Sequence, residues 1–175
     1  MRGTVTAVVS AAALITTVAL APSAVAADRW SLNGTYTATS NGEWARTNDV
    51  FRNEVSLRSI WTISSQCSYP GECTGTVNSD LGWTAPIYQT GGTWYVKHVV
   101  PNWITCPDGV TTVSGFQVFR FMGTTPDGAS ADPSATTLVG EDITTGASGS
   151  CGRMASGSKA LSLSQISTVG ARFPG

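Results

Sequence analysis

The 175-residue chain carries 10 basic and 11 acidic residues, a net charge of −1 at pH 7, and a charged fraction of only 12%. This balance gives the chain no excess of positive charge that would attract nucleic acid or an anionic membrane surface, so neither is an expected partner. Once an N-terminal targeting segment is removed, the remaining length fits one domain with its own core.

The N-terminal segment has the three parts of a secretory signal peptide. Arg2 provides a positive start, Val5 to Ala21 is apolar or small, and the stretch closes on small residues up to Ala26. This pattern predicts cleavage after Ala26, so that residues 1–26 are a signal peptide and residues 27–175 a single secreted domain. Because Thr and Ala dilute the apolar run, no stable membrane anchor is expected after cleavage. The expected location is extracellular or in the cell envelope.

Four cysteines in an exported chain predict two disulfides. Cys67 and Cys73 flank Pro70-Gly71, a turn dipeptide that brings the ends of its segment together. The sequence therefore predicts the pairs Cys67–Cys73 and Cys106–Cys151. The long spacing of the second pair is not that of a zinc site, and no metal or cofactor is expected.

Alternation of apolar and polar residues, rather than a helical period, runs through the predicted mature chain. The expected strands, in chain order, cover residues 32–39, 54–65, 73–79, 83–88, 93–100, 110–122, 136–142 and 161–166. Loops are expected at residues 123–135 and 144–158, where Gly, Ser, Thr, Pro and Asp dominate.

Two of these strands have strongly apolar faces. In residues 54–65 one face carries Val55, Leu57, Trp61 and Ile63. The strand after the Gly91-Gly92 turn carries Trp94, Val96 and His98 on one face, and Pro101 is expected to end it because proline cannot donate to a ladder. We expect these two faces to look inward at each other.

Eight or nine short strands separated by turns predict an all-β fold. Successive hairpins favour an antiparallel up-and-down β-barrel, lipocalin-like in outline, and a closed sheet removes exposed strand edges. A β-sandwich is the alternative architecture.

Several motifs carry a resemblance to known proteins. They are Leu32-Asn33-Gly34-Thr35-Tyr36, the segment Thr47 to Phe51, the segment Trp61 to Cys67, and the Cys73-x-Gly75-x-Val77-x-Ser79-x-x-Gly82-Trp83 pattern. With them the chain resembles a group of small secreted actinobacterial proteins, mainly mycobacterial, of unassigned function. The resemblance implies an extracellular or envelope location and no known activity. Gly34-Thr35-Tyr36 also resembles the Gly-x-aromatic element on the first strand of lipocalin-like barrels, with Tyr at the position of the usual Trp.

The residues needed for catalysis are not found in a recognisable pattern. Gly-x-Ser-x-Gly is absent, and the single histidine, His98, lies on an apolar strand face, which predicts a structural role. Glu141 and Asp142 are adjacent, so on a strand they point to opposite faces and do not form a carboxylate pair. The sequence therefore predicts a protein that is not an enzyme.

The chain has six tryptophans, all between Trp30 and Trp103, and this is the most informative feature of its composition. They either fill the core or line a pocket. The leading hypothesis is a non-enzymatic secreted β-domain that binds a small apolar ligand of the cell envelope in an aromatic-lined barrel. The alternative is an extracellular interaction protein that contacts protein or polysaccharide through surface aromatics and loops. The candidate ligand-binding residues are Trp61, Trp94, His98, Phe119 and Phe121.

Overall fold

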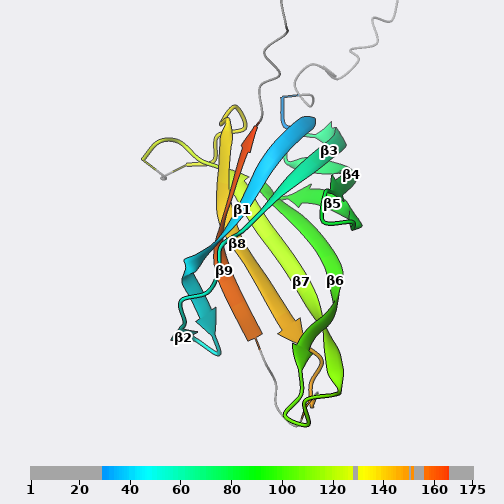
Figure 1. The fold of residues 1–175 in the computed structure, drawn as a ribbon. Helices are drawn as coiled ribbons and strands as arrows, with labels where there is room; N and C mark the ends of the chain where they lie inside the picture. Colours follow the sequence, from blue (N-terminus) through cyan, green and yellow to red (C-terminus); the bar gives the residue numbers. More distant parts are fainter. Residues whose placement is uncertain (1–28, 128–129, 150, 152–155, 166–175) are drawn as a thin grey trace, which may run out of the picture.

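The computed structural model describes residues 29–127, 130–149, 151 and 156–165, which form an antiparallel sheet of nine strands (Figure 1). The predicted signal peptide, residues 1–26, lies outside the described residues. The strands are β1 (Gly34–Thr47), β2 (Val50–Phe51), β3 (Leu57–Tyr69), β4 (Glu72–Ser79), β5 (Thr84–Thr90), β6 (Thr93–Thr105), β7 (Thr112–Gly123), β8 (Thr137–Gly146) and β9 (Ser156–Gln165). From β3 to β9 each strand pairs with its neighbours in sequence, so the predicted all-β, up-and-down order is confirmed.

The sheet closes into a ring because β1 is paired along both edges. Ala38 of β1 lies opposite Ser59 of β3 on one side and opposite Leu163 of β9 on the other. Closure creates one inner face, and strand alternation directs every second side chain into it.

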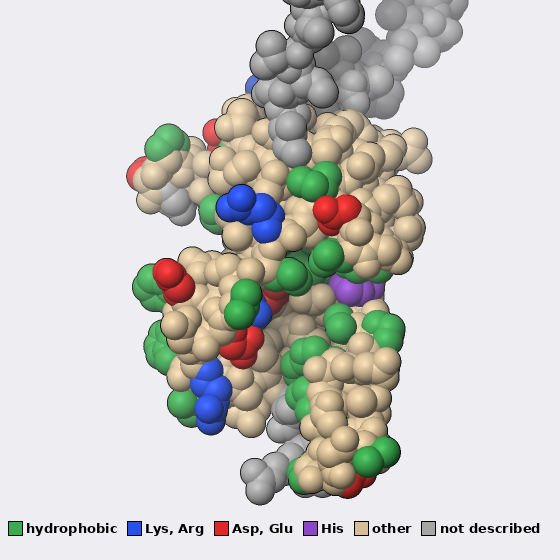
Figure 2. All heavy atoms as spheres, in the orientation of Figure 1, with side chains coloured by type: hydrophobic (Ala, Val, Ile, Leu, Met, Phe, Trp, Pro, Cys, Tyr) green, Lys and Arg blue, Asp and Glu red, His purple; other side chains and the backbone are tan. Residues whose placement is uncertain are grey.

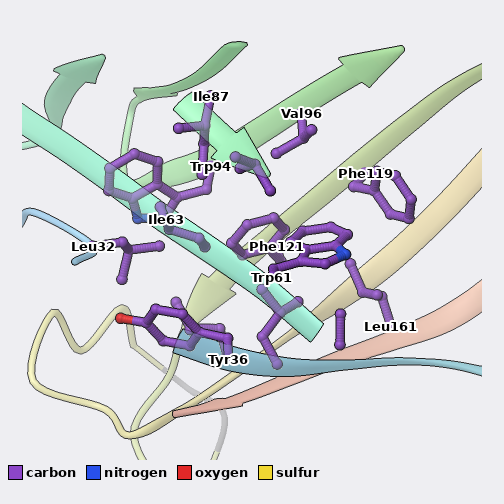
Figure 3. Close-up of a cluster of buried hydrophobic side chains, with 14 of the residues drawn as sticks. Leu32, Tyr36, Trp61, Ile63, Ile87, Trp94, Val96, Phe119, Phe121 and Leu161 are labelled. Atoms are coloured by element: carbon purple, nitrogen blue, oxygen red, sulfur yellow. The ribbon is translucent and has the colours of Figure 1, made fainter. Parts of the chain in front are cut away.

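One end of the ring, which we call the packed end, is filled by large apolar side chains. Its most deeply buried members are Trp61, Trp94, Phe121, Ile87, Leu163, Val77 and Val96. The ring centroid of Trp61 lies 4.9 Å from that of Phe119 and 6.2 Å from that of Phe121. Figure 3 shows these side chains converging from opposite strands. The expected apposition of the Trp61–Ile63 face and the Trp94–Val96 face is therefore present.

The inward face of β3 is shorter than the sequence pattern indicates. Val55 precedes the strand and is 87% exposed, and Leu57, its first residue, is 50% exposed. The segment before β3 lies instead against β1, where the amide of Glu54 donates to the carbonyl of Gly42 at 3.0 Å. The prediction that Val55 faces the core is wrong because this backbone contact displaces it from the strand register.

Pro101 does not end its strand, contrary to the prediction, since β6 continues to Thr105. The β6–β7 register shifts between Val100 and Ile104, and Asn102 adopts a φ of 52°. A bulge of this kind needs no ladder N–H from proline. The loop expected at residues 144–158 is likewise shorter, because β8 runs to Gly146 and β9 begins at Ser156.

Both predicted disulfides are confirmed, and no cysteine is free. Cys67 and Cys73 are directly opposite residues of β3 and β4. Cys106, just after β6, is joined to Cys151, between β8 and β9. Two disulfides favour an oxidising, extracellular location.

Removing the long-range disulfide is expected to cost more stability than removing the short one. The bonded cysteines are 45 residues apart in one case and 6 in the other. The loop-entropy relation gives a loss of about 4 kcal/mol for the double variant Cys106→Ser, Cys151→Ser and about 2.4 kcal/mol for Cys67→Ser, Cys73→Ser. Urea denaturation of the two double variants measures the difference, and equal losses would contradict it.

Within the described residues, the indole Nε1 of Trp61 is buried and has no hydrogen-bond partner. Trp61→Ala is expected to lower the free energy of unfolding by about 3–5 kcal/mol through cavity formation. Trp61→Phe should cost clearly less, because it keeps an aromatic ring and removes the unsatisfied donor. Denaturation curves of both variants test this, and equal costs would show that the indole itself is required.

Candidate functional site

We call the end of the ring opposite the packed end the open end. The inner face of the ring changes from apolar to polar towards it. On β1 the inward residues Tyr36 and Ala38 are followed by Ser40. On β8 Leu138 is followed by the polar residues Asp142 and Thr144. On β9 the inward residues Leu163 and Leu161 give way to Lys159. The register places the changes at adjacent inward levels, since Ser40 lies opposite Leu161 and Asp142 lies opposite Lys159, two residues away along β9. These smaller and polar side chains do not fill the ring.

A cavity of about 410 Å³ occupies this region, and we call it the open-end cavity. Its apolar lining is Leu57, Val100, Trp103 and Ile104, and its polar lining includes Ser40, Glu54, Gln117, Asp142, Thr144 and Lys159. Figure 2 shows a hollow between the two lobes of the open end, bordered by hydrophobic side chains, with the single histidine at its edge. The volume and the mixed lining are those of a small-molecule site.

The ladder between β5 and β6 is short. The two strands pair only through Ile87–Thr90 and Thr93–Val96. Beyond this ladder the ring of Trp83 stacks on that of His98, with centroids 4.3 Å apart. Nε2 of His98 donates to Oε1 of Gln117 at 2.9 Å, which joins the stack to the cavity lining. Beyond the short ladder, an aromatic stack therefore connects Trp83, just before β5, with β6.

Trp103 forms a wall of the cavity because glycines make room for it. A Cβ atom on Gly115 of β7 would lie 2.7 Å from the Trp103 ring, and one on Gly157 of β9 would lie 3.6 Å from it. The indole therefore lies close to the inner face of β7 and reaches β9. The bulge in β6 and the disulfide at Cys106 hold this part of the chain in place.

Asp142 is the most unusual group in the cavity. Its side chain is 4% exposed, and the hydroxyl of Ser40 donates to its Oδ2. Burial raises the pKa of the Asp142 carboxyl, while the Ser40 hydrogen bond and the charge of Lys159 oppose part of that rise. Lys159 itself places Nζ 3.0 Å from Oε2 of Glu54 and donates to the carbonyl of Val55 at 3.4 Å. The lysine ammonium is therefore paired directly with Glu54, and its charge acts on Asp142 from beyond ion-pair distance.

The five residues named from the sequence lie together at and beside the packed end. Trp61, Trp94, Phe119 and Phe121 belong to the buried core, and half-buried His98 stacks on Phe119 with centroids 5.8 Å apart. None of the five is among the residues that line the open-end cavity.

The sequence interpretation missed Ser40, Trp103, Asp142 and Lys159 as a group. A signal was present, since Asp142 and Lys159 each continue the inward alternation of a strand whose other inward positions are mostly apolar or Gly. The expected divergence of Glu141 and Asp142 is observed: Glu141 pairs with Arg120 on the outer surface, and Asp142 is buried.

Within the described ranges, no three side chains of His, Cys, Asp or Glu lie close enough together to hold a metal ion. In the same part of the chain no helix has the length and apolar character needed to cross a bilayer.

The fold has a solved counterpart. The chain is similar to the monomer form of the sensor domain of PknI from M. tuberculosis, with a TM-score of 0.55 and 15% identity. The match covers 82% of this chain and 92% of that chain. No family model and no curated protein matches the sequence. At this identity the likeness concerns the fold alone; it agrees with the mycobacterial side of the resemblance, and the lipocalin-like resemblance stays an expectation.

The raised pKa of Asp142 makes a prediction about stability and pH. The folded protein holds the proton of the Asp142 carboxyl more tightly than the unfolded chain does. The contribution of this group to the free energy of unfolding is therefore fully present below its ordinary pKa of 3.8 and is lost as the pH rises through the raised pKa. The stability of the wild type relative to Asp142→Asn should therefore fall with rising pH above about 3.8 and then level off. Urea denaturation across this range measures it, with Glu141→Gln on the outer face as the control. A difference that grows with pH would contradict the prediction.

Proposed function

We propose that this chain is a non-enzymatic, secreted binding domain that holds a small ligand with an apolar body in the open-end cavity. One observation carries the proposal: the ring is solid at one end and hollow at the other, where apolar walls face buried polar groups. Apolar lining with a few fixed polar groups is the usual composition of a ligand pocket.

The apolar wall suits a hydrocarbon or ring system. Trp103 offers a broad surface, and Val100, Ile104 and Leu57 add aliphatic surface to the lining. Burial of ligand carbon against these residues supplies affinity at about 25 cal/mol per Å² of apolar surface removed from water. The polar lining groups Ser40, Asp142 and Thr144 are themselves buried and can orient a ligand.

The hydrogen bonds of the cavity support binding rather than catalysis. His98 donates to Gln117, and Ser40 donates to Asp142. The base beside a nucleophilic serine is usually an oriented histidine. The single histidine, His98, bonds to Val99 and Gln117 and to no serine among the described residues. The similar structure is that of a sensor domain, which is in keeping with a binding role.

A second candidate function is contact with protein or polysaccharide through surface aromatics. Trp44 and Phe51, on paired strands β1 and β2, are 60% and 57% exposed, and the guanidinium of Arg46 lies 4.4 Å from the Phe51 ring centroid. Exposed aromatic and arginine side chains are frequent in binding hot spots.

A neutral polarity-sensitive dye, prodan, tests the cavity proposal. We expect saturable binding with a blue shift of the dye emission. Leu57→Glu, which puts a charge in the apolar wall, should weaken binding about tenfold, which corresponds to about 1.4 kcal/mol. Val55→Glu is the matched control, since Val55 is close in sequence, exposed and outside the lining, and it should change binding less than twofold.

Two results would overturn the proposal. The absence of saturable prodan binding would show that the cavity does not accept apolar ligands. Equal binding to the wild type, Leu57→Glu and Val55→Glu would place the dye elsewhere and favour the surface aromatics.

A further inference from the structure

We propose that the open-end cavity selects ligands that carry a positively charged amine, with the ammonium group held beside the carboxylate of Asp142. This inference rests on the proposed binding function and adds the chemical class of the ligand.

The first argument is that Asp142 is a buried carboxyl without a direct ion pair. Among the described residues, no Lys, Arg or His nitrogen lies within ion-pair distance of its oxygens, and Lys159 acts on it only from further away. Its hydrogen bonds come from neutral groups, the Ser40 hydroxyl and the backbone N–H of Lys159. A buried charge without compensation is costly, and a cation brought by the ligand supplies the compensation.

The second argument is that the backbone directs Lys159 away from this role. Glu54, which pairs with Lys159, is held against β1 by the hydrogen bond from its amide to the Gly42 carbonyl. A Cβ atom at position 42 would lie 2.0 Å from the Glu54 carbonyl oxygen, so only glycine permits this approach. The lysine ammonium is thereby paired with Glu54, and Asp142, its cross-strand neighbour, has no ion pair of its own.

The third argument is the charge balance of the lining. The charged lining residues are Glu54, Asp142 and Lys159, two negative and one positive, for a sum of −1 when all are ionised. An anionic ligand meets two carboxylates and a lysine that is already paired. A cationic ligand meets a net negative site in a region of reduced water access, where electrostatic attraction is stronger than at the surface.

The fourth argument is that the same cavity provides an aromatic face. The Trp103 indole lines the cavity together with the aliphatic side chains Val100 and Ile104. Tryptophan attracts cations through its ring quadrupole, and the aliphatic residues accept the carbon skeleton. An alkyl or aryl amine matches both parts of the lining.

The experiment compares three probes with one carbon skeleton: hexylamine, hexanol and hexanoate. Binding is measured near pH 7 by the change in tryptophan fluorescence and by calorimetry. In the wild type we expect hexylamine to bind at least about tenfold more tightly than hexanoate and several-fold more tightly than hexanol.

The variants separate charge from shape. Asp142→Asn keeps the side-chain volume and should reduce the preference for hexylamine over hexanol to about one. Lys159→Met removes the positive charge of the lining and should strengthen hexylamine binding several-fold. Glu141→Gln is the matched control, because Glu141 neighbours Asp142 but pairs with Arg120 outside the ring, and it should leave the preference unchanged.

The outcomes distinguish this inference from the proposed function. Prodan and hexanol binding with no preference for hexylamine would overturn the amine selectivity and leave the binding function standing. An amine preference that persists in Asp142→Asn would overturn the role of Asp142. If prodan and all three six-carbon probes fail to bind, the binding function itself is overturned.

Discussion

Pairing of β1 with both β3 and β9 closes the sheet, and the rest of the structure depends on this closure. The closed ring contains eight strands, β1 and β3 to β9, because β2 pairs with β1 alone. A closed sheet of eight strands encloses a space that side chains just fill. The size of the inward residues at each level therefore decides whether the ring is solid or hollow there.

The interior of the ring is filled differently at its two ends. At the packed end, Trp61, Trp94 and Phe121 are the largest of the fully buried side chains and fill the interior. At the open end, hydroxyl and ionisable groups share the lining with Leu57, Val100, Trp103 and Ile104, and a buried carboxyl is retained although it costs stability. Functional sites often depart from good core packing, and a stable scaffold elsewhere compensates for the lost stability. The position of the open-end cavity beside a solid core follows this division.

The open end is held in shape by contacts other than apolar packing. The Cys106–Cys151 disulfide joins the end of β6 to the connection between β8 and β9, a bulge follows Val100 in β6, and the Trp83–His98 stack joins β6 to the start of β5. Gly42 and Gly115 allow the backbone of Glu54 and the ring of Trp103 to approach closely. Walls fixed in this way lose little entropy when a ligand binds, which favours affinity in a small pocket.

The sequence by itself determined the features that depend on short-range pattern. Alternation identified most strands, Pro70-Gly71 indicated the Cys67–Cys73 hairpin, and adjacency placed Glu141 and Asp142 on opposite faces. Tertiary structure decided the displacement of Val55, the continuation of β6 through Pro101 and the location of the hollow. These features depend on register between distant strands: Ser40 and Asp142, which are 102 residues apart, meet because both flank β9. The period of a strand tells which side chains point inward, but only closure of the sheet brings together the inward residues that share one level, and their combined size and charge determine whether that level is core or cavity.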